Sequence, residues 1–193
     1  MIILGIETSC DETSASVVED GIKVHSNIVA SQQDLHSRFG GVVPEIACRA
    51  HTDTIITVVD KAVTEANIKQ GDIDAISVAN TPGLIGALLI GLTTAKTLSW
   101  LLEIPLITIN HLHAHIYASK IEHGDIDYPA ISLVVSGGHT SLFLTQSETR
   151  HEQVGGTIDD AAGEAFDKVA RLLGFSYPGG PAIAEEAEKF IRN

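Results

Sequence analysis

The sequence is poor in cysteine and in basic residues. Its 193 residues include 2 cysteines, Cys10 and Cys48, which are too few and too far apart for a disulfide framework or a thiolate zinc site. It has 12 Lys and Arg residues against 25 Asp and Glu, a net charge of −13. Because affinity for a polyanion depends on cations that neutralise phosphates, this balance argues against non-specific nucleic-acid binding. Any contact with RNA must be local or shared with a partner.

The N-terminus lacks the features of a secretory signal. A short apolar run without a basic region leads directly into the polar segment Glu7–Ser9, so we expect a cytoplasmic protein. The stretch 83–109 carries only the charges of Lys96 and Glu103 and is long enough to cross a bilayer. Because Pro105 divides it, we interpret it as a buried helix followed by a core strand and expect no membrane span.

The order of the predicted elements is that of an α/β protein. With 44% hydrophobic residues, the chain can bury a sizeable core. The hydrophobic periodicity predicts strands at 2–6, 14–18, 23–30, 74–79 and 106–109, with helices from Pro44 to about residue 62 and from 84 to 102. The first part of the chain therefore has the order three strands, helix, strand, helix, strand.

A second copy of the opening pattern begins near Ala130. Strands are predicted at 131–135 and 141–145 on either side of the small polar loop Ser136–Thr140. A third strand near 152–156 and helices at 160–173 and 182–192 follow. The second copy lacks its fourth and fifth strands.

This duplication predicts the architecture of actin, hexokinase and Hsp70, the ASKHA or RNase H-like fold, with an incomplete second lobe. We expect a first RNase H-like lobe over 1–110, a metal-binding helix and connection over 111–129, and the incomplete second lobe over 130–193. In this architecture two polar loops hold the phosphates of a nucleotide. Gly137 and Gly138 would allow a close backbone approach to an anion, and we favour this interpretation over an ordinary turn.

Three histidines follow the strand that ends at Asn110. Residues four apart share a helical face, so His111 and His115 could bind one metal ion, while His113 points to another side. Two imidazoles need further ligands, and a hydrogen-bonded histidine cluster is the alternative. A zinc protease would need a glutamate directly after the first histidine as its general base. Position 112 is leucine, which excludes that class.

Several short motifs of this sequence occur in the same order as in one protein family. They are Glu7–Thr13, 41–45, 49–51, 81–84, 110–115, 134–140, 159–168 and 177–181. Together they resemble the TsaD family, also called the glycoprotease or universal threonylcarbamoyladenosine family, over essentially the whole chain. A non-catalytic paralogue lacks the two histidines and the Ser-Gly-Gly-His loop, so the resemblance is to the catalytic subunit.

The resemblance implies an acyltransferase that moves a threonylcarbamoyl group from threonylcarbamoyl-AMP to N6 of adenosine 37 in tRNAs reading codons that begin with A. It implies a cytoplasmic protein with one divalent ion, Fe²⁺ or alternatively Zn²⁺. It also implies tRNA and two partner subunits, a non-catalytic paralogue and an ATPase. His111 and His115 match the metal ligands. The positions that match substrate-binding residues are Val134, Val135, Ser136, Gly137, Gly138, Asp167 and Gly180.

Other residues have less specific roles under this resemblance. Asp167 could accept hydrogen bonds from the ribose hydroxyls. Asp11 and Glu12 are the candidate catalytic residues, which could orient the amine or a cation, or could form an exposed acidic turn. Lys168 and Arg171 are interpreted as solvated or paired with neighbouring acids rather than as tRNA contacts.

The family pattern also extends past this sequence. Its third metal ligand, an aspartate, and a nucleotide-contacting asparagine lie in a C-terminal part that this sequence does not include, and position 184 is alanine where some members have aspartate. We therefore favour a fragment of the transferase, inactive by itself, and expect exposed strand edges and apolar helix faces. The alternatives are a truncated, non-catalytic binding or scaffold relative and a nucleotide-hydrolysing or sugar-phosphorylating enzyme of the same fold.

Overall fold

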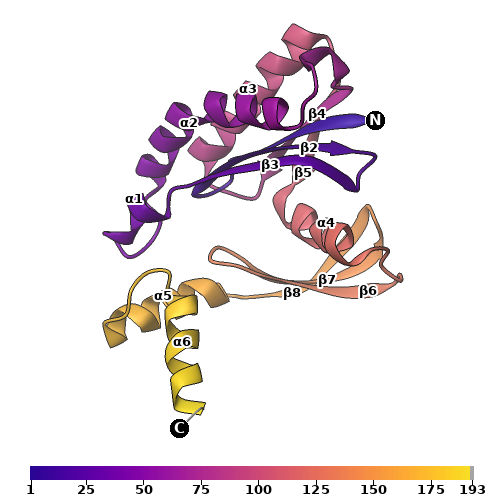
Figure 1. The fold of residues 1–193 in the computed structure, drawn as a ribbon. Helices are drawn as coiled ribbons and strands as arrows, with labels where there is room; N and C mark the ends of the chain where they lie inside the picture. Colours follow the sequence, from indigo (N-terminus) through magenta and orange to yellow (C-terminus); the bar gives the residue numbers. More distant parts are fainter. Residues whose placement is uncertain (192–193) are drawn as a thin grey trace. The chain divides into compact units, whose positions relative to one another are not determined.

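The computed structural model describes residues 1–191 and divides into two compact units (Figure 1). Unit 1 comprises Met1–Gln32 and Val42–Ala114. Unit 2 comprises Gln33–Gly41 and the chain from His115 onward. The division falls inside one helix, because α4 (His111–His123) begins in unit 1 and continues into unit 2.

Unit 1 is a mixed five-stranded sheet with two helices packed on it. Its strands are β1 (Ile2–Glu7), β2 (Glu12–Glu19), β3 (Lys23–Ser31), β4 (Ala75–Thr81) and β5 (Leu106–Asn110), in the spatial order β3-β2-β1-β4-β5. β1 pairs antiparallel with β2 and parallel with β4. The helices α2 (Pro44–Glu65) and α3 (Ile85–Leu102) pack against each other and the sheet, and a short 3-10 turn, η1 (Gln70–Asp72), precedes β4.

The core of unit 1 follows from the alternation of its strands. Leu4 and Ile6 of β1 point to the same face of the sheet and are 1% and 3% exposed. They meet the apolar face of α2, which contributes Ile55 and Val58. Pro44 occupies the start of α2, where a missing N–H breaks no helical hydrogen bond. β1 is therefore the central, fixed strand, and its carboxyl end positions the loop that follows.

The helix α3 differs from expectation in its burial. Its bounds match the predicted helix, but the buried residues are the small side chains Ala87, Gly91 and Ala95, four residues apart, whereas Trp100 is 82% exposed. The small face lets α3 approach the sheet closely. Ile90, Leu92 and Leu98 pack against the core at its margin, whereas Ile85, Leu89 and Leu101 are exposed. By length and composition α3 is the one described helix that could cross a membrane, which is weak evidence because core helices also meet that criterion.

The strand after α3 was also expected to be part of the core. In the structure β5 is the edge of the sheet, and Ile107 is 44% exposed. An edge strand contacts a neighbour on one side only, so an apolar sequence alone does not place a strand at the centre. Leu106 packs against the core, so the expectation of a core strand holds for one end of β5 and is wrong for Ile107.

Unit 2 contains a three-stranded antiparallel sheet and helices. The strands are β6 (Ala130–Val135), β7 (Thr140–Ser147) and β8 (Arg150–Gly156), in the order β6-β7-β8. The helices are α1 (Gln33–Ser37), the continuation of α4, α5 (Ala162–Leu173) and α6 (Gly179–Ile191). α5 and α6 pack against each other.

The first strands of the two sheets confirm the duplication in part. β6 pairs antiparallel with β7 as β1 does with β2, but among the described residues β6 has no parallel neighbour corresponding to β4. Ile131 and Leu133 of β6 are each 64% exposed, and Leu172 of α5 is 85% exposed. The expected exposed strand edge and apolar faces are confirmed.

Candidate functional site

The loop after β1 is held tightly by the start of α3. Thr8 is completely buried and donates its hydroxyl proton to the carbonyl oxygen of Ala87 at 2.8 Å. The N–H of Leu84 donates to the carbonyl oxygen of Ser9 at 2.8 Å. A Cβ at Gly83 would lie 2.6 Å from that same oxygen, which explains glycine at this position. The polar loop is therefore a rigid feature of unit 1.

A buried histidine supports the other side of this loop. His51 of α2 is 0% exposed, and its Nε2 lies 2.9 Å from the carbonyl oxygen of Cys10. Its Nδ1 lies 2.7 Å from Oγ1 of Thr13, which in turn lies 3.0 Å from Oγ1 of Thr54. Buried polar groups are stable only when they are hydrogen-bonded, so this network fixes the loop from both ends.

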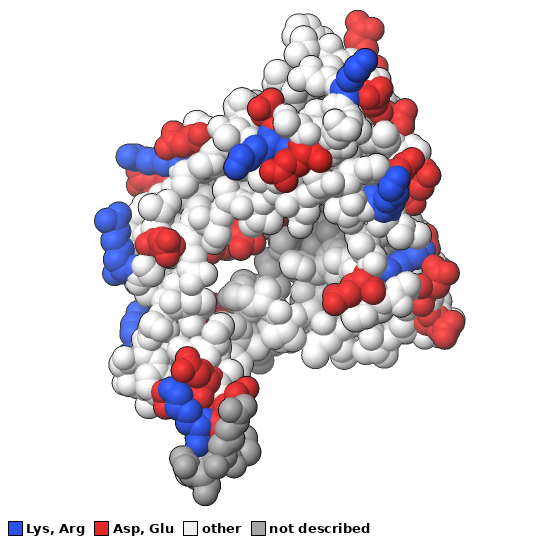
Figure 2. Space-filling view, viewed as in Figure 1, with Lys and Arg blue, Asp and Glu red and all other residues white. Residues whose placement is uncertain are grey.

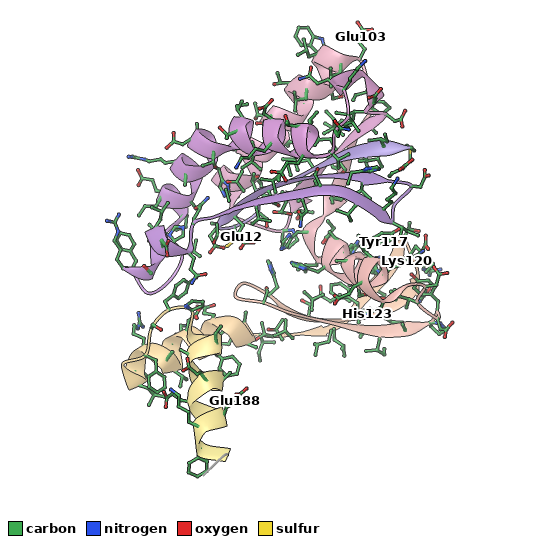
Figure 3. All side chains as sticks on the ribbon, in the orientation of Figure 1. Glu12, Glu103, Tyr117, Lys120, His123 and Glu188 are labelled. Carbon is green, nitrogen blue, oxygen red and sulfur yellow. The ribbon has the colours of Figure 1, made fainter. Side chains whose placement is uncertain are left out.

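The candidate catalytic carboxylates lie on this supported loop. The carbonyl oxygen of Asp11 accepts the N–H of Gln32 at 3.0 Å, and Glu12 is exposed at the start of β2 (Figure 3). Burial, followed by the negative charge of Asp11, raises the pKa of the neighbouring Cys10 to about 12. Cys10 is thus a protonated thiol at neutral pH, and the catalytic role of Asp11 and Glu12 stays a prediction.

His111 is bound to the carboxyl end of β1. Its Nδ1 lies 3.0 Å from Oε2 of Glu7 and 3.3 Å from Oγ of Ser9. Glu7 also accepts the N–H of Ser9 through Oε1. Burial raises the pKa of Glu7, but the hydrogen bonds from His111 and Ser9 together outweigh burial, and the net pKa lies below its ordinary value. Glu7 is therefore an ionised acceptor at neutral pH.

The expected metal pair lies on a single helix. His111 and His115 are both in α4, four residues apart, where the helical repeat places side chains on one face. Asn110 accepts the N–H of Leu112 at 2.8 Å and that of His113 at 3.3 Å, which caps the start of this helix. Over residues 1–191 no group of three or more His, Cys, Asp or Glu side chains could hold a metal ion. The two imidazoles could therefore supply two of the ligands that a metal ion needs, but not the complete set.

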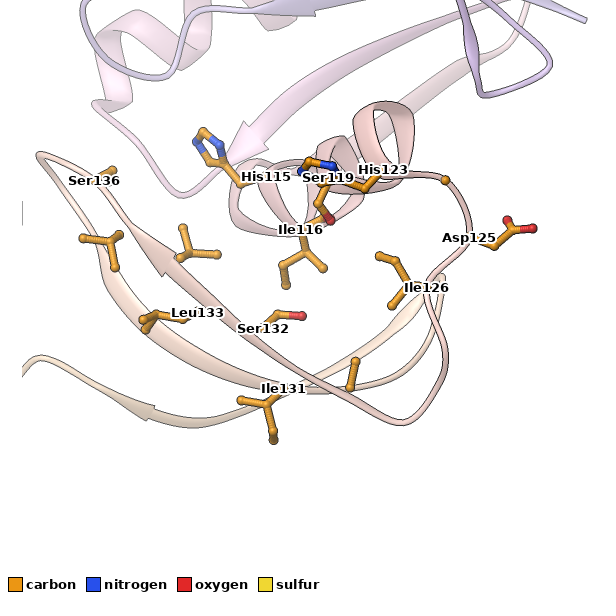
Figure 4. A pocket seen from close by; sticks show the side chains of 14 residues that line it. His115, Ile116, Ser119, His123, Asp125, Ile126, Ile131, Ser132, Leu133 and Ser136 are labelled. Atoms are coloured by element: carbon orange, nitrogen blue, oxygen red, sulfur yellow. The ribbon is translucent and has the colours of Figure 1, made fainter.

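Unit 2 brings four of the expected site residues to one cavity. The cavity has a volume of about 520 Å³ and lies between α4 and β6 (Figure 4). Its lining includes His115, Val134, Val135 and Ser136. Val134 is 7% exposed and could meet a ligand mainly through its backbone, whereas Val135 is 53% exposed. In Figure 4, Ile116 points from α4 toward the strand.

The loop between β6 and β7 is a tight turn packed on α5. The N–H of Ser136 donates to the carbonyl oxygen of His139 at 2.8 Å, so this N–H is already used within the turn. A Cβ at Gly163 would lie 2.7 Å from the carbonyl oxygen of Ser136. Among the described residues, no heavy atom beyond the chain neighbours lies within 4 Å of a Cβ built at Gly137 or Gly138. Those two glycines remain the residues of the loop that could approach an anion.

Asp167 and Gly180 lie where α5 meets α6. Asp167 accepts the N–H of Gly179 through Oδ1 at 2.7 Å and so stabilises the start of α6. A Cβ at Gly179 would lie 2.5 Å from the carbonyl oxygen of Phe166, whereas Gly180 has open space around it. Oδ2, the other carboxylate oxygen of Asp167, could accept a hydrogen bond from a ribose hydroxyl.

A second cavity of unit 2 adjoins Asp167 and carries two arginines. Its volume is about 370 Å³, and its lining includes Arg38, Asp167 and Arg171. Arg38 also lies over the ring of Phe39 at 4.8 Å from its centroid. In the described part of the chain neither arginine forms an ion pair. Sequence reasoning did not single out Arg38, because the segment around it has no periodic pattern.

Several other cations of the described residues are paired with acids. Lys168 lies 2.5 Å from Asp160 and 3.1 Å from Glu164, which confirms the expected pairing of this lysine. Lys120 of α4 bonds Glu148 and Asp125 and lies 5.8 Å from the centroid of the Tyr117 ring (Figure 3). On the face shown in Figure 2, acidic and basic side chains are intermingled. The described part of this face therefore has no extended basic surface, and its Lys and Arg side chains lie singly among acidic ones.

Comparison with solved structures defines the class. The chain is similar to YeaZ from Pseudomonas aeruginosa, with a TM-score of 0.52 and 17% identity over 80% of this chain and 64% of that one. It is also similar to the ethanolamine utilization protein EutJ from Carboxydothermus hydrogenoformans, with a TM-score of 0.55 and 14% identity over 100% of this chain and 62% of that one. The fold is that of the actin-like, ASKHA class, as predicted.

Sequence comparison identifies the family. The family described as "TsaD: tRNA N6-adenosine threonylcarbamoyltransferase" matches residues 23–192. A protein of that name from Syntrophomonas wolfei is 60% identical over 97% of this chain and 56% of its own length. One from Bacillus subtilis is 54% identical over 98% of this chain and 54% of its own length. The chain belongs to the TsaD family, and it spans about half the length of the curated relatives that it matches.

Proposed function

We propose that this chain is the metal- and nucleotide-binding part of a tRNA N6-adenosine threonylcarbamoyltransferase. The observation that carries the proposal is the cavity of unit 2 in which His115 meets Val134, Val135 and Ser136. These residues come from α4 and from the end of β6, so a side chain of a metal-ligand type lies beside the strand that leads into the glycine loop. The family name supplies the type of reaction, the transfer of threonylcarbamoyl to N6 of an adenosine in tRNA. We infer in addition that the donor is threonylcarbamoyl-AMP and that the acceptor is adenosine 37 of tRNAs reading codons that begin with A.

The residues of unit 2 would bind and orient the acyl adenylate. Gly137 and Gly138 would donate backbone N–H groups to its negative oxygens, and the positions where their Cβ atoms would stand are open. Asp167 is held by Gly179 and accepts a hydrogen bond from a ribose hydroxyl through its second oxygen. The open space around Gly180 admits the nucleotide. In unit 1, Asp11 and Glu12 would orient the incoming amine.

His111 and His115 would hold one divalent ion, Fe²⁺ or alternatively Zn²⁺, as half of its donor set. When bound, such an ion supplies Lewis acidity toward phosphate or carbonyl oxygens. The described residues contain no group of three or more His, Cys, Asp or Glu side chains that could hold a metal ion, so the two imidazoles would need further ligands.

The partners would be tRNA, a non-catalytic paralogue and an ATPase, all in the cytoplasm. A net charge of −13 leaves little general affinity for RNA, so local cations must supply it. Arg38 and Arg171 are suited to this role because they line one cavity and form no ion pair in the described part of the chain. Guanidinium groups bind phosphate oxygens in a bidentate manner. The cavity beside Asp167 is therefore our choice for a contact with tRNA, which revises the interpretation of Arg171 made from the sequence.

The test is product formation on unmodified tRNA supplied with threonylcarbamoyl-AMP, Fe²⁺ and the partner subunits. Two proteins would be compared: this chain, and a completed version extended with the C-terminal part of a relative. We expect threonylcarbamoyladenosine from the completed version and none from the short chain. Product from neither, with binding of the partner subunits retained, would favour the non-catalytic scaffold. Phosphate release from ATP without tRNA would favour a nucleotide-hydrolysing enzyme.

A further inference from the structure

The contact between Glu7 and His111 joins two elements that are distant in the sequence. Glu7 ends the central strand β1, and His111 begins α4, 104 residues later. Their side chains are 30% and 18% exposed, so the pair is partly shielded from water. Oε2 of Glu7 lies 3.0 Å from Nδ1 of His111.

We propose that Glu7 is the positioning residue that fixes the tautomer of His111 and directs its Nε2 to the metal ion. The inference rests on the metal pair of the proposed function. An ionised carboxylate only accepts hydrogen bonds, so in a neutral imidazole facing Glu7 the proton resides on Nδ1. Nε2 then carries the lone pair, which is the atom a metal needs. Metal-bound histidines commonly donate their other N–H to a carboxylate in this way.

Both ends of the contact are fixed by the fold. Leu4 and Ile6, which precede Glu7, are almost completely buried in the core. The other carboxylate oxygen of Glu7 accepts the N–H of Ser9, which restricts the rotation of the carboxylate. On the His111 side, Asn110 caps α4 and sets the direction in which the helix begins. An imidazole held in this way loses little conformational entropy when it binds a metal.

The substitution Glu7→Gln separates this role from simple packing. Glutamine has nearly the same shape and can still accept the N–H of Ser9 through its single oxygen. Its NH₂ group then faces His111 and donates to Nδ1, so the imidazole proton moves to Nε2 and blocks ligation. Glu7→Asp keeps the charge but withdraws the carboxylate, and should have an intermediate effect.

The chain offers a matched control of the same chemical type. Glu19 and His25 form a carboxylate–imidazole pair in unit 1, with Oε2 and Nε2 2.8 Å apart. Neither residue belongs to the proposed site. Glu19→Gln therefore removes an equivalent carboxylate–imidazole contact, and it should leave both metal affinity and the tautomer of His111 unchanged.

The experiment measures two quantities on the completed protein and these variants. The first is affinity for Co²⁺ and Zn²⁺ by calorimetric titration, and the second is the tautomer of His111 in metal-free protein by ¹⁵N NMR. We expect Glu7→Gln to weaken metal binding about 10- to 100-fold and to move the His111 proton from Nδ1 to Nε2. Wild-type affinity or an unchanged tautomer in Glu7→Gln would overturn the inference. If the wild-type protein made product and bound metal as expected, such a result for Glu7→Gln would overturn the role of Glu7 and leave the proposed function intact. Absence of metal binding by wild-type protein would overturn the proposed metal pair as well.

Discussion

Gly91 of α3 lies directly against Thr8, so that a Cβ at position 91 would collide with the Thr8 hydroxyl oxygen. The same hydroxyl group donates to the carbonyl oxygen of Ala87. Gly91→Ala should therefore displace the loop after β1, although alanine favours a helix intrinsically. We expect a loss of about 1–3 kcal/mol in the free energy of unfolding, measured by urea denaturation. Gly71→Ala is the control, because no described atom outside its chain neighbours lies within 4 Å of that position. Equal stability of the two variants would contradict the close approach of α3.

His51 should be more important for stability than an exposed histidine. His51→Ala removes the imidazole that is hydrogen-bonded to the Cys10 carbonyl oxygen and to the Thr13 hydroxyl group, and this imidazole is completely buried. Each buried group left unsatisfied costs about 1–3 kcal/mol. We expect lower stability and faster hydrogen exchange of amides 8–13. His123→Ala, at a position where the side chain is 73% exposed, should change neither quantity measurably. Unchanged exchange in His51→Ala would show that the network does not hold the loop.

The sequence predicted the order of the main elements because their periodicity is strong. The strands and helices appear where alternation and helical spacing place them, whereas α1 and η1 were missed, since both are short and polar. On α2, Ile55 and Val58 are buried as the pattern indicates. His51 lies on the same buried face, and its position on that face was the available signal for the network around Cys10.

The candidate site was predictable in its residues but not in its contacts. The helical spacing of His111 and His115 is a local property, and the structure places both on α4. The bond of His111 to Glu7 spans 104 residues and depends on where β1 and β5 lie in the sheet. The burial of α3 and β5 was overestimated for a related reason, because an apolar sequence does not reveal how many neighbours an element has.

Cys10 should resist alkylation in the folded protein. Burial, and after it the charge of Asp11, raises the pKa of its thiol from 9.0 to about 12, and only the thiolate is nucleophilic. In a Cys48→Ser variant, iodoacetamide at pH 8 should modify Cys10 slowly when native and rapidly when unfolded, as followed by mass spectrometry.

The same shift of the Cys10 pKa gives a pH dependence of stability. Between pH 9.0 and about 12 the Cys10 thiol ionises in the unfolded protein but not in the folded protein. The stabilising contribution of Cys10 to the free energy of unfolding is therefore fully present below pH 9.0 and is lost as the pH rises toward 12. In a Cys10→Ala variant the free energy of unfolding should therefore fall less between pH 9.0 and 12 than in the wild-type protein. Rapid alkylation of native Cys10 at pH 8 would contradict the raised pKa.

The two arginines beside Asp167 should contribute to tRNA affinity. Arg38→Ala combined with Arg171→Ala, in the completed protein, should weaken binding of unmodified tRNA and reduce the slope of log K against log salt by about 1.4–1.8, if each contacts one phosphate. Lys61→Ala combined with Lys96→Ala removes the same charge from exposed positions of unit 1 and should have a smaller effect. Equal slopes for the two double variants would rule out a specific contact at the cavity.

The most direct test of the central claim is the position of the transferred group. The completed protein, with Fe²⁺, threonylcarbamoyl-AMP and its partner subunits, would be given one tRNA that reads codons beginning with A and a matched tRNA with guanosine in place of adenosine 37. Nucleoside mass spectrometry should show threonylcarbamoyladenosine in the first tRNA and no transferred group in the second. Modification of neither tRNA, or equal modification of both, would contradict the proposed function.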